Sequence, residues 1–131
     1  MENSTIFITG GTGSFGNAVL SRFLDSDVKE IRVFSRDEKK QEEMRIALNH
    51  PKLKFYIGDV RDYDSIHQAM KGVDYVFHLA AESRIQPAVE NPINAVSLNS
   101  VGTCTVLQCS KEAGVKRVVY SSTSSGYGMN E

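Results

Sequence analysis

The sequence has almost no excess charge of either sign, no long hydrophobic run and only two cysteines. A net charge of −1 over 131 residues leaves no broad basic surface, which argues against wrapping of nucleic acid and adhesion to an anionic membrane. No apolar run approaches the roughly 18 residues of a membrane span, and the polar first four residues lack the features of a signal peptide. We therefore expect a cytoplasmic protein whose partner is a small molecule.

The cysteines and histidines are too scattered to predict a metal site. Cys104 and Cys109 have no second Cys or His pair at metal-ligand spacing around them, so we interpret them as small, half-buried apolar residues. The three histidines are equally dispersed. His78 ends an apolar segment and is predicted to be a hydrogen-bonded core residue rather than a ligand or a base.

The most informative feature present is a glycine-rich turn that directly follows a predicted strand. Residues 6–16 read Ile-Phe-Ile-Thr-Gly-Gly-Thr-Gly-Ser-Phe-Gly, and the apolar residues of 17–24 then recur at helical spacing. In this context Gly10, Gly13 and Gly16 let the backbone approach a pyrophosphate, and the first amides of the helix face that anion. The motif predicts a dinucleotide site. The alternative is a plain strand, turn and helix whose glycines serve only the turn.

Segments typical of strands and of helices alternate along the chain. The pattern predicts strands over 5–9, 30–34, 54–57, 73–79 and 117–122, and helices over 17–24, 37–49, 63–70 and 91–113. With 131 residues and 40% hydrophobic content, residues 1–131 are expected to form one domain. We predict an α/β fold of the Rossmann type, a doubly wound parallel sheet of about five strands in the order 3-2-1-4-5 with helices on both faces.

This topology has a switch point between the first and fourth strands, where ligands bind at the carboxyl ends of the strands. Five short segments are therefore expected around one crevice: residues 10–16, 35–36, 59–60, 80–81 and 121–123.

The end of the second strand bears on which cofactor fits. An NAD site normally places an acid there for the ribose 2′-hydroxyl, but this strand ends in Ser35 and Arg36. A hydroxyl and a guanidinium match a 2′-phosphate, which favours NADP as cofactor, with NAD as the alternative. Two other interpretations remain open: Arg36 is a solvated loop residue, and Asp37 takes the ribose or caps the next helix.

Five motifs occur together in the order and at the spacing of one known family. They are residues 9–16, Gly58-Asp59-Val60, residues 78–81 (His-Leu-Ala-Ala), Asn99 and residues 120–128. Across essentially the whole chain they resemble the extended short-chain dehydrogenase/reductase family, specifically its nucleotide-sugar epimerases and dehydratases. The first half is more similar to UDP-N-acetylglucosamine 4,6-dehydratases and the second half to UDP-hexose 4-epimerases. Those dehydratases carry Asp-Lys where this chain has Ser124 and Ser125, which argues against dehydration.

The resemblance assigns roles by position. It implies a pyrophosphate site at Gly10, Gly13, Ser14, Phe15 and Gly16. It also implies that Ser35 and Arg36 meet the adenosine ribose or its phosphate, and that Asp59 and Val60 contact adenine. Ala80 and Ala81 would flank the nicotinamide, with Asn99 supporting the cofactor pocket. Thr123 would be catalytic, hydrogen-bonded to the sugar hydroxyl that is oxidised. The structural alternatives are turn amides satisfied by Asp59, small core residues at Ala80 and Ala81, and a hydroxyl-rich turn at Thr123.

The family's catalytic base is missing from these residues. In the family a tyrosine with a lysine four positions later accepts the sugar C4 hydroxyl proton, whereas Tyr127 is followed there by Glu131. The resemblance thus implies the NAD(P)-binding domain of a nucleotide-sugar epimerase or dehydratase of surface-polysaccharide sugar biosynthesis, not catalytic alone. It would bind a UDP-sugar only with the missing substrate lobe supplied. The alternative is a free-standing dinucleotide-binding or redox-sensing module without sugar chemistry.

Self-association is a further expectation. A fifth strand with no neighbour leaves an open edge, and the helix over 91–113 is expected to expose apolar side chains. The candidates are Ala95, Val96, Leu98, Val101, Val106, Leu107 and Ala113. Related enzymes use this helix region as a dimer contact, which implies a homo-oligomer.

Overall fold

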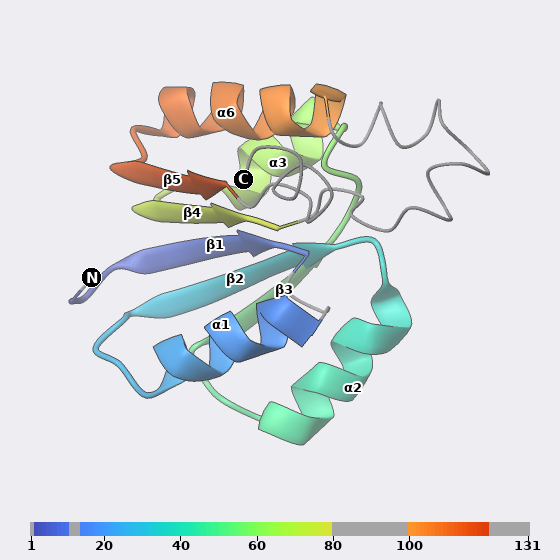
Figure 1. Ribbon diagram of the computed structural model, residues 1–131, viewed down its shortest axis with the longest axis vertical. Coiled ribbons are helices and arrows are strands. Elements are labelled where there is room, and N and C mark those ends of the chain that lie inside the picture. Colours follow the sequence, from blue (N-terminus) through green and yellow to red (C-terminus); the bar gives the residue numbers. More distant parts are fainter. Residues whose placement is uncertain (1, 11–13, 80–99, 121–131) are drawn as a thin grey trace, which may run out of the picture.

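The computed structural model describes residues 2–10, 14–79 and 100–120, in which strands and helices alternate (Figure 1). The strands are β1 (Thr5–Thr9), β2 (Glu30–Ser35), β3 (Leu53–Ile57), β4 (Tyr75–His78) and β5 (Arg117–Tyr120). The helices are α1 (Ser14–Leu24), α2 (Glu38–Leu48), α3 (Tyr63–Ala69) and α6 (Gly102–Ala113). The strands form a parallel sheet in the order β3-β2-β1-β4-β5, which confirms the predicted fold class and strand order.

Helices cover both faces of this sheet, α1 and α2 on one side and α3 and α6 on the other (Figure 1). Successive side chains of a strand point to opposite faces, so Ile6 and Ile8 of β1 join one core cluster and Phe7 joins the other. All three side chains are fully buried. Since burial of one such side chain contributes about 1.5–3 kcal/mol, the two clusters hold the strands in register and align their carboxyl ends at one edge.

The helices begin and end at residues suited to those positions. Asp37 caps α2 by accepting a hydrogen bond from the Lys40 amide at 2.9 Å, and Asn49 ends that helix in the left-handed conformation. Asp62 caps α3 through the Ser65 amide, and Gly114 ends α6 at a φ of 74°. These caps fix where each loop meets its helix, and the loops that end at Asp37 and Asp62 carry candidate site residues.

The helix predicted over 91–113 is described only from residue 100 onward, because residues 91–99 lie outside the described part. Val101, which directly precedes α6, and Leu107 on α6 are about half exposed, as expected. The prediction for Val106 was wrong: its side chain is fully buried, because it packs into the cluster between α6 and the sheet. Among the described helices, none is long and apolar enough to span a membrane.

Candidate functional site

A pocket of about 220 Å³ opens at the carboxyl ends of the strands, beside β1, β2 and β3. The residues that line it are Gly10, Phe34, Ser35, Arg36, Asp37, Gly58 and Val60. Its walls come from the last residues of β2 and from the loops that follow the three strands, which end at the same edge because they are parallel. The structure thus brings together Gly10, Ser35, Arg36 and Val60, which the sequence placed around one crevice.

Two glycines bring backbone close to this pocket. Gly10 has a φ of 73°, which a residue with a Cβ adopts only with strain, and its amide donates to the Phe34 carbonyl at 3.1 Å. A Cβ at Gly58 would lie 2.7 Å from the Phe34 ring, so only glycine lets the β3 loop pass that ring undisturbed. Phe34 and Gly58 line the pocket but were not predicted as site residues.

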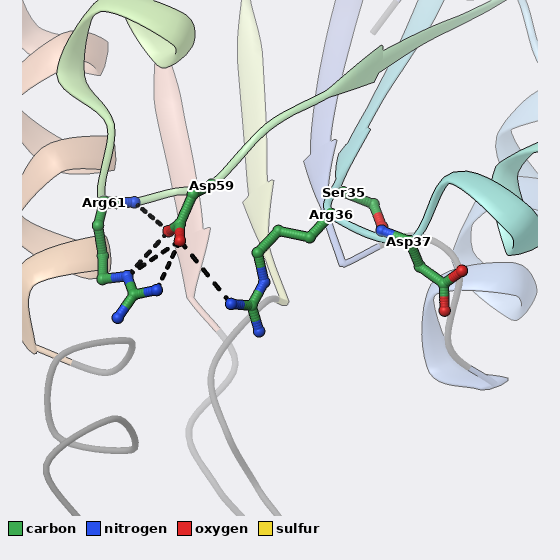
Figure 2. Close-up of polar contacts among 5 residues, drawn as sticks. All are labelled: Ser35, Arg36, Asp37, Asp59 and Arg61. Atoms are coloured by element: carbon green, nitrogen blue, oxygen red, sulfur yellow. Dashed lines mark hydrogen bonds and ion pairs between the residues drawn. The ribbon is translucent and has the colours of Figure 1, made fainter.

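Arg36, Asp59 and Arg61 form a charged cluster next to the pocket (Figure 2). The Asp59 carboxylate lies between the two guanidinium groups: Arg61 Nη2 is 2.6 Å from Asp59 Oδ2, and Arg36 Nη1 is 3.8 Å from it. The Arg61 amide also donates to Asp59 Oδ1 at 2.8 Å. These contacts, chiefly the side-chain hydrogen bonds from Arg61, hold the pKa of Asp59 below its usual value against the opposing effect of partial burial. The cluster has one positive charge in excess.

Arg61 was missed at the sequence level, although it is the strongest partner of a residue that was predicted. Asp59 satisfies the turn amide of Arg61, which was the structural alternative for it. An Asp followed two residues later by Arg in a loop was the available signal, but such a pair is common on surfaces.

Asp37 is used as a helix cap. Its carboxylate accepts from the Lys40 amide and points away from Asp59, while its own amide donates to Ser35 Oγ at 3.0 Å (Figure 2). This agrees with one of the two alternatives considered for Asp37, the cap of the next helix. The side chain of Arg36, about half exposed, is therefore the charged group of the β2 loop that extends toward Asp59.

The start of α1 follows the glycine-rich turn. The helix begins at Ser14, and its first turn contains no acidic residue that would repel an anion. Phe15 lies in the same first turn, and Gly16 is a buried residue of the same helix. Gly13, Ala80, Ala81, Asn99 and Thr123 lie outside the described residues, so their predicted roles stay predictions.

His78 lies at the carboxyl end of β4 and is almost completely buried. Its Nδ1 is 2.7 Å from Thr9 Oγ1 on β1, and its Nε2 is 3.1 Å from Thr103 Oγ1 on α6. Burial lowers the pKa of His78 from the usual 6.5 to about 4, so the ring is neutral at pH 7. The prediction of a hydrogen-bonded core histidine agrees with these contacts. Thr103, its partner on the helix, was not predicted.

Comparison with known proteins gives one consistent answer. The family model for "polysaccharide biosynthesis protein" matches residues 6–126. Relatives named UDP-glucose 4-epimerase, from Rickettsia bellii and Rickettsia rickettsii, are 58% and 59% identical over 125 residues. Those alignments cover 92% of this chain but only 37% of each relative, so the chain spans little more than a third of their length.

Solved structures show the same likeness. The structure of Pen from Bacillus thuringiensis superposes with a TM-score of 0.87 at 37% identity, over 91% of this chain and 37% of that one. A UDP-glucose 4-epimerase from Bifidobacterium longum, solved with NAD⁺ and UDP, gives a TM-score of 0.81 at 25% identity, over 95% of this chain and 38% of that one. The resemblance to the nucleotide-sugar epimerases of the extended short-chain dehydrogenase/reductase family is thereby confirmed. The chain belongs to the polysaccharide biosynthesis protein family.

Proposed function

We propose that this chain is the NAD(P)-binding domain of a nucleotide-sugar epimerase or dehydratase that acts in the cytoplasm on sugars for surface polysaccharides. The observation that carries the proposal is the pocket at the carboxyl edge of the sheet, which Gly10 and Arg36 help to line. Relatives named UDP-glucose 4-epimerase support the sugar-nucleotide part. Neighbours solved with NAD support a nicotinamide dinucleotide as the cofactor.

The residues of the site fit such a cofactor. The first turn of α1 contains no acidic side chain, so the backbone amides at the start of this helix suit a pyrophosphate. Val60 and the Phe34 ring give the pocket an apolar wall suited to adenine, and Gly58 admits backbone close to that ring. When bound, the nicotinamide supplies the acceptor for the hydride of the sugar C4–H bond. The described residues hold and orient the adenosine end of the cofactor.

We further propose a preference for NADP, with NAD as the alternative. Asp37 accepts the Lys40 amide and points away from Asp59, which leaves the ribose side without a free acid from the β2 loop. Among the described residues, the ion pair of Arg36 is a 3.8 Å contact with Asp59, so a 2′-phosphate competes easily for its guanidinium.

The catalytic part of the proposal rests on the family resemblance. Thr123 would hydrogen-bond the oxidised sugar hydroxyl, Ala80 and Ala81 would flank the nicotinamide, and Asn99 would support the pocket. None of the tyrosines in the sequence has a lysine four positions later, so we expect these 131 residues to bind cofactor without turning over a UDP-sugar. We also propose a homo-oligomer, supported by the exposed side chains of Val101, which precedes α6, and of Leu107 on α6.

The test is calorimetric titration of the 131-residue chain and its Arg36→Gln variant with NADP⁺ and NAD⁺. Loss of a charged hydrogen bond should weaken NADP⁺ binding by about 10- to 100-fold and change NAD⁺ binding little. Arg45→Gln is the matched control, because Arg45 is equally exposed and pairs with Glu42 away from the pocket.

Two results would contradict the proposal. If the folded chain binds neither dinucleotide, the proposed cofactor function is wrong. If Arg36→Gln weakens the binding of NADP⁺ and NAD⁺ equally, the proposed preference for NADP is wrong. Titration with UDP-glucose together with the dinucleotide distinguishes the alternative function. A redox-sensing module would be favoured if the chain binds the cofactor tightly as a monomer. It should then add nothing to UDP-glucose binding, even when the substrate-binding part of a related epimerase is supplied as a separate chain.

A further inference from the structure

A second polar cluster lies between α3 and α6, on the face of the sheet opposite to α1 and α2 (Figure 1). Its members are His67 of α3 and Cys109 and Glu112 of α6, with Tyr63 at the start of α3 beside them. The nitrogen, sulfur and oxygen atoms that His67, Cys109 and Glu112 offer as ligands all lie within 4.8 Å of one another. No local sequence pattern indicates this group, because its members come from two helices far apart along the chain.

We propose that His67, Cys109 and Glu112 form a divalent zinc site that joins α3 to α6. The ligand types support zinc, which prefers thiolate sulfur, imidazole nitrogen and carboxylate oxygen in tetrahedral geometry. In such a site the ligand atoms lie roughly 3.5 Å from one another, so small side-chain rotations must bring the three ligand atoms closer together. His67 and Glu112 have that freedom, because their side chains are 43% and 35% exposed.

The surroundings already orient these ligands. His67 Nδ1 is 3.5 Å from Glu112 Oε1, and the His67 ring stacks on Tyr63 with centroids 5.4 Å apart and an angle of 16° between planes. The Tyr63 hydroxyl donates to Glu112 Oε1, and Gln108 Nε2 donates to Glu112 Oε2 at 2.9 Å. Partners of this kind outside the ligand shell typically fix the orientation of metal ligands.

Cys109 supplies the deepest ligand. Its side chain is buried, and its thiol donates only a weak hydrogen bond to the Tyr63 carbonyl, at 3.8 Å. Burial raises the pKa of this thiol to about 11, so it is protonated in the free protein at pH 7. Zinc binding forms one Zn–S bond and releases the thiol proton to solvent, while the exposed sides of His67 and Glu112 leave room for a water as the fourth ligand. The site is independent of the proposed cofactor function.

The test uses the metal-free 131-residue chain titrated with Co²⁺ and then with Zn²⁺. A Co²⁺–thiolate bond produces charge-transfer absorption in the near ultraviolet, which Zn²⁺ should abolish by displacement at one ion per chain. We expect Cys109→Ser to remove this absorption, and His67→Ala to weaken Co²⁺ and Zn²⁺ binding at least tenfold. Tyr63→Phe should weaken both by about tenfold, because it removes a partner outside the ligand shell.

Controls come from the same residue types elsewhere. Cys104 is exposed on α6, and His50 lies beside β3, so Cys104→Ser and His50→Ala should bind as the parent does. Far-ultraviolet circular dichroism of each variant checks folding, and His67→Ala tests the site without a change in the core. The proposal fails if the parent shows no thiolate absorption at stoichiometric Co²⁺. It also fails if His67→Ala keeps the parent affinity, or if a control variant alone abolishes binding.

Discussion

The polar cluster beside the pocket and the one between α3 and α6 contain one carboxylate each, yet they suit ligands of opposite charge. Asp59 lies between the guanidiniums of Arg36 and Arg61 beside the pocket. Glu112 instead accepts from the neutral groups of Tyr63 and Gln108, with no Lys or Arg among the ion-pair partners described for it. The first cluster therefore carries an excess positive charge suited to a phosphate, and the second a negative charge suited to a cation.

The comparison also shows that a lowered carboxyl pKa does not by itself reveal the charge of a site. The pKa of Asp59 is lowered mainly by hydrogen bonds from the Arg61 side chain, and that of Glu112 mainly by the hydrogen bond from Tyr63. Both donors favour the ionised carboxylate, but only the guanidinium also cancels its charge. The charge of the hydrogen-bond donors around each carboxylate, rather than the lowered pKa itself, distinguishes the two sites.

His78, at the carboxyl end of β4, is a third polar group and is kept neutral by burial, and charging it should have the largest effect on stability. Its pKa is lowered to about 4 in the folded protein, against about 6.5 unfolded. The unfolded chain therefore binds a proton first as the pH falls, and stability is lost progressively between pH 6.5 and pH 4, by about 3 kcal/mol in total. Urea unfolding at a series of pH values measures this loss.

The variant His78→Gln isolates that contribution. It should be less stable at pH 7, because the hydrogen bonds of the His78 ring with the Thr9 and Thr103 hydroxyls are lost or weakened. Its stability should nevertheless fall less steeply than that of the parent below pH 6.5. His50→Gln, a change at a more exposed histidine, should retain the steep fall. If His78→Gln and the parent lose stability in parallel, the buried ring is not the group that titrates.

Two glycines with the same backbone conformation, one at the pocket and one at the end of α6, separate an effect on cofactor binding from an effect of backbone strain. Gly10 and Gly114 have almost the same φ, 73° and 74°, but Gly10 lines the pocket, whereas Gly114 ends α6 with no atom of the described residues within 4 Å of an added Cβ. Each substitution to alanine should cost about 1–2 kcal/mol of stability from the left-handed conformation alone. Only Gly10→Ala should also weaken NADP⁺ binding, as measured by calorimetry well below the unfolding temperature. Equal cofactor affinities in the two variants would separate Gly10 from the site.

The sequence predicted the framework because its signals are local. Hydrophobic periodicity marked the strands and helices, and the glycine spacing and the strand ends located Gly10, Ser35, Arg36 and Val60. Parallel strand ends meet at one edge by geometry, so a correct strand order was enough to bring these residues together.

What the sequence did not predict depends on contacts between distant segments. Arg32 sits within β2, and its guanidinium donates to the Ala69 and Lys71 carbonyls at the end of α3, which no local pattern indicates. Val106 was expected to be exposed because periodicity shows an apolar face of a helix but not which neighbour covers it. The cluster of His67, Cys109 and Glu112 was not predicted for the same reason, since α3 and α6 meet only in the folded chain.

The smallest expected effect concerns the weak contact that holds Arg36. Asp59→Asn removes the carboxylate 3.8 Å from Arg36, and a pair this exposed contributes at most about 1 kcal/mol. We expect the ratio of NADP⁺ to NAD⁺ affinity to rise by up to about fivefold, because Arg36 is freed for the 2′-phosphate while any contact of residue 59 with adenine affects both cofactors alike. Glu42→Gln is the control, since it frees Arg45 outside the pocket and should leave the ratio unchanged. A fall in the ratio for Asp59→Asn would mean that Asp59 orients Arg36 toward the ribose rather than competing for it.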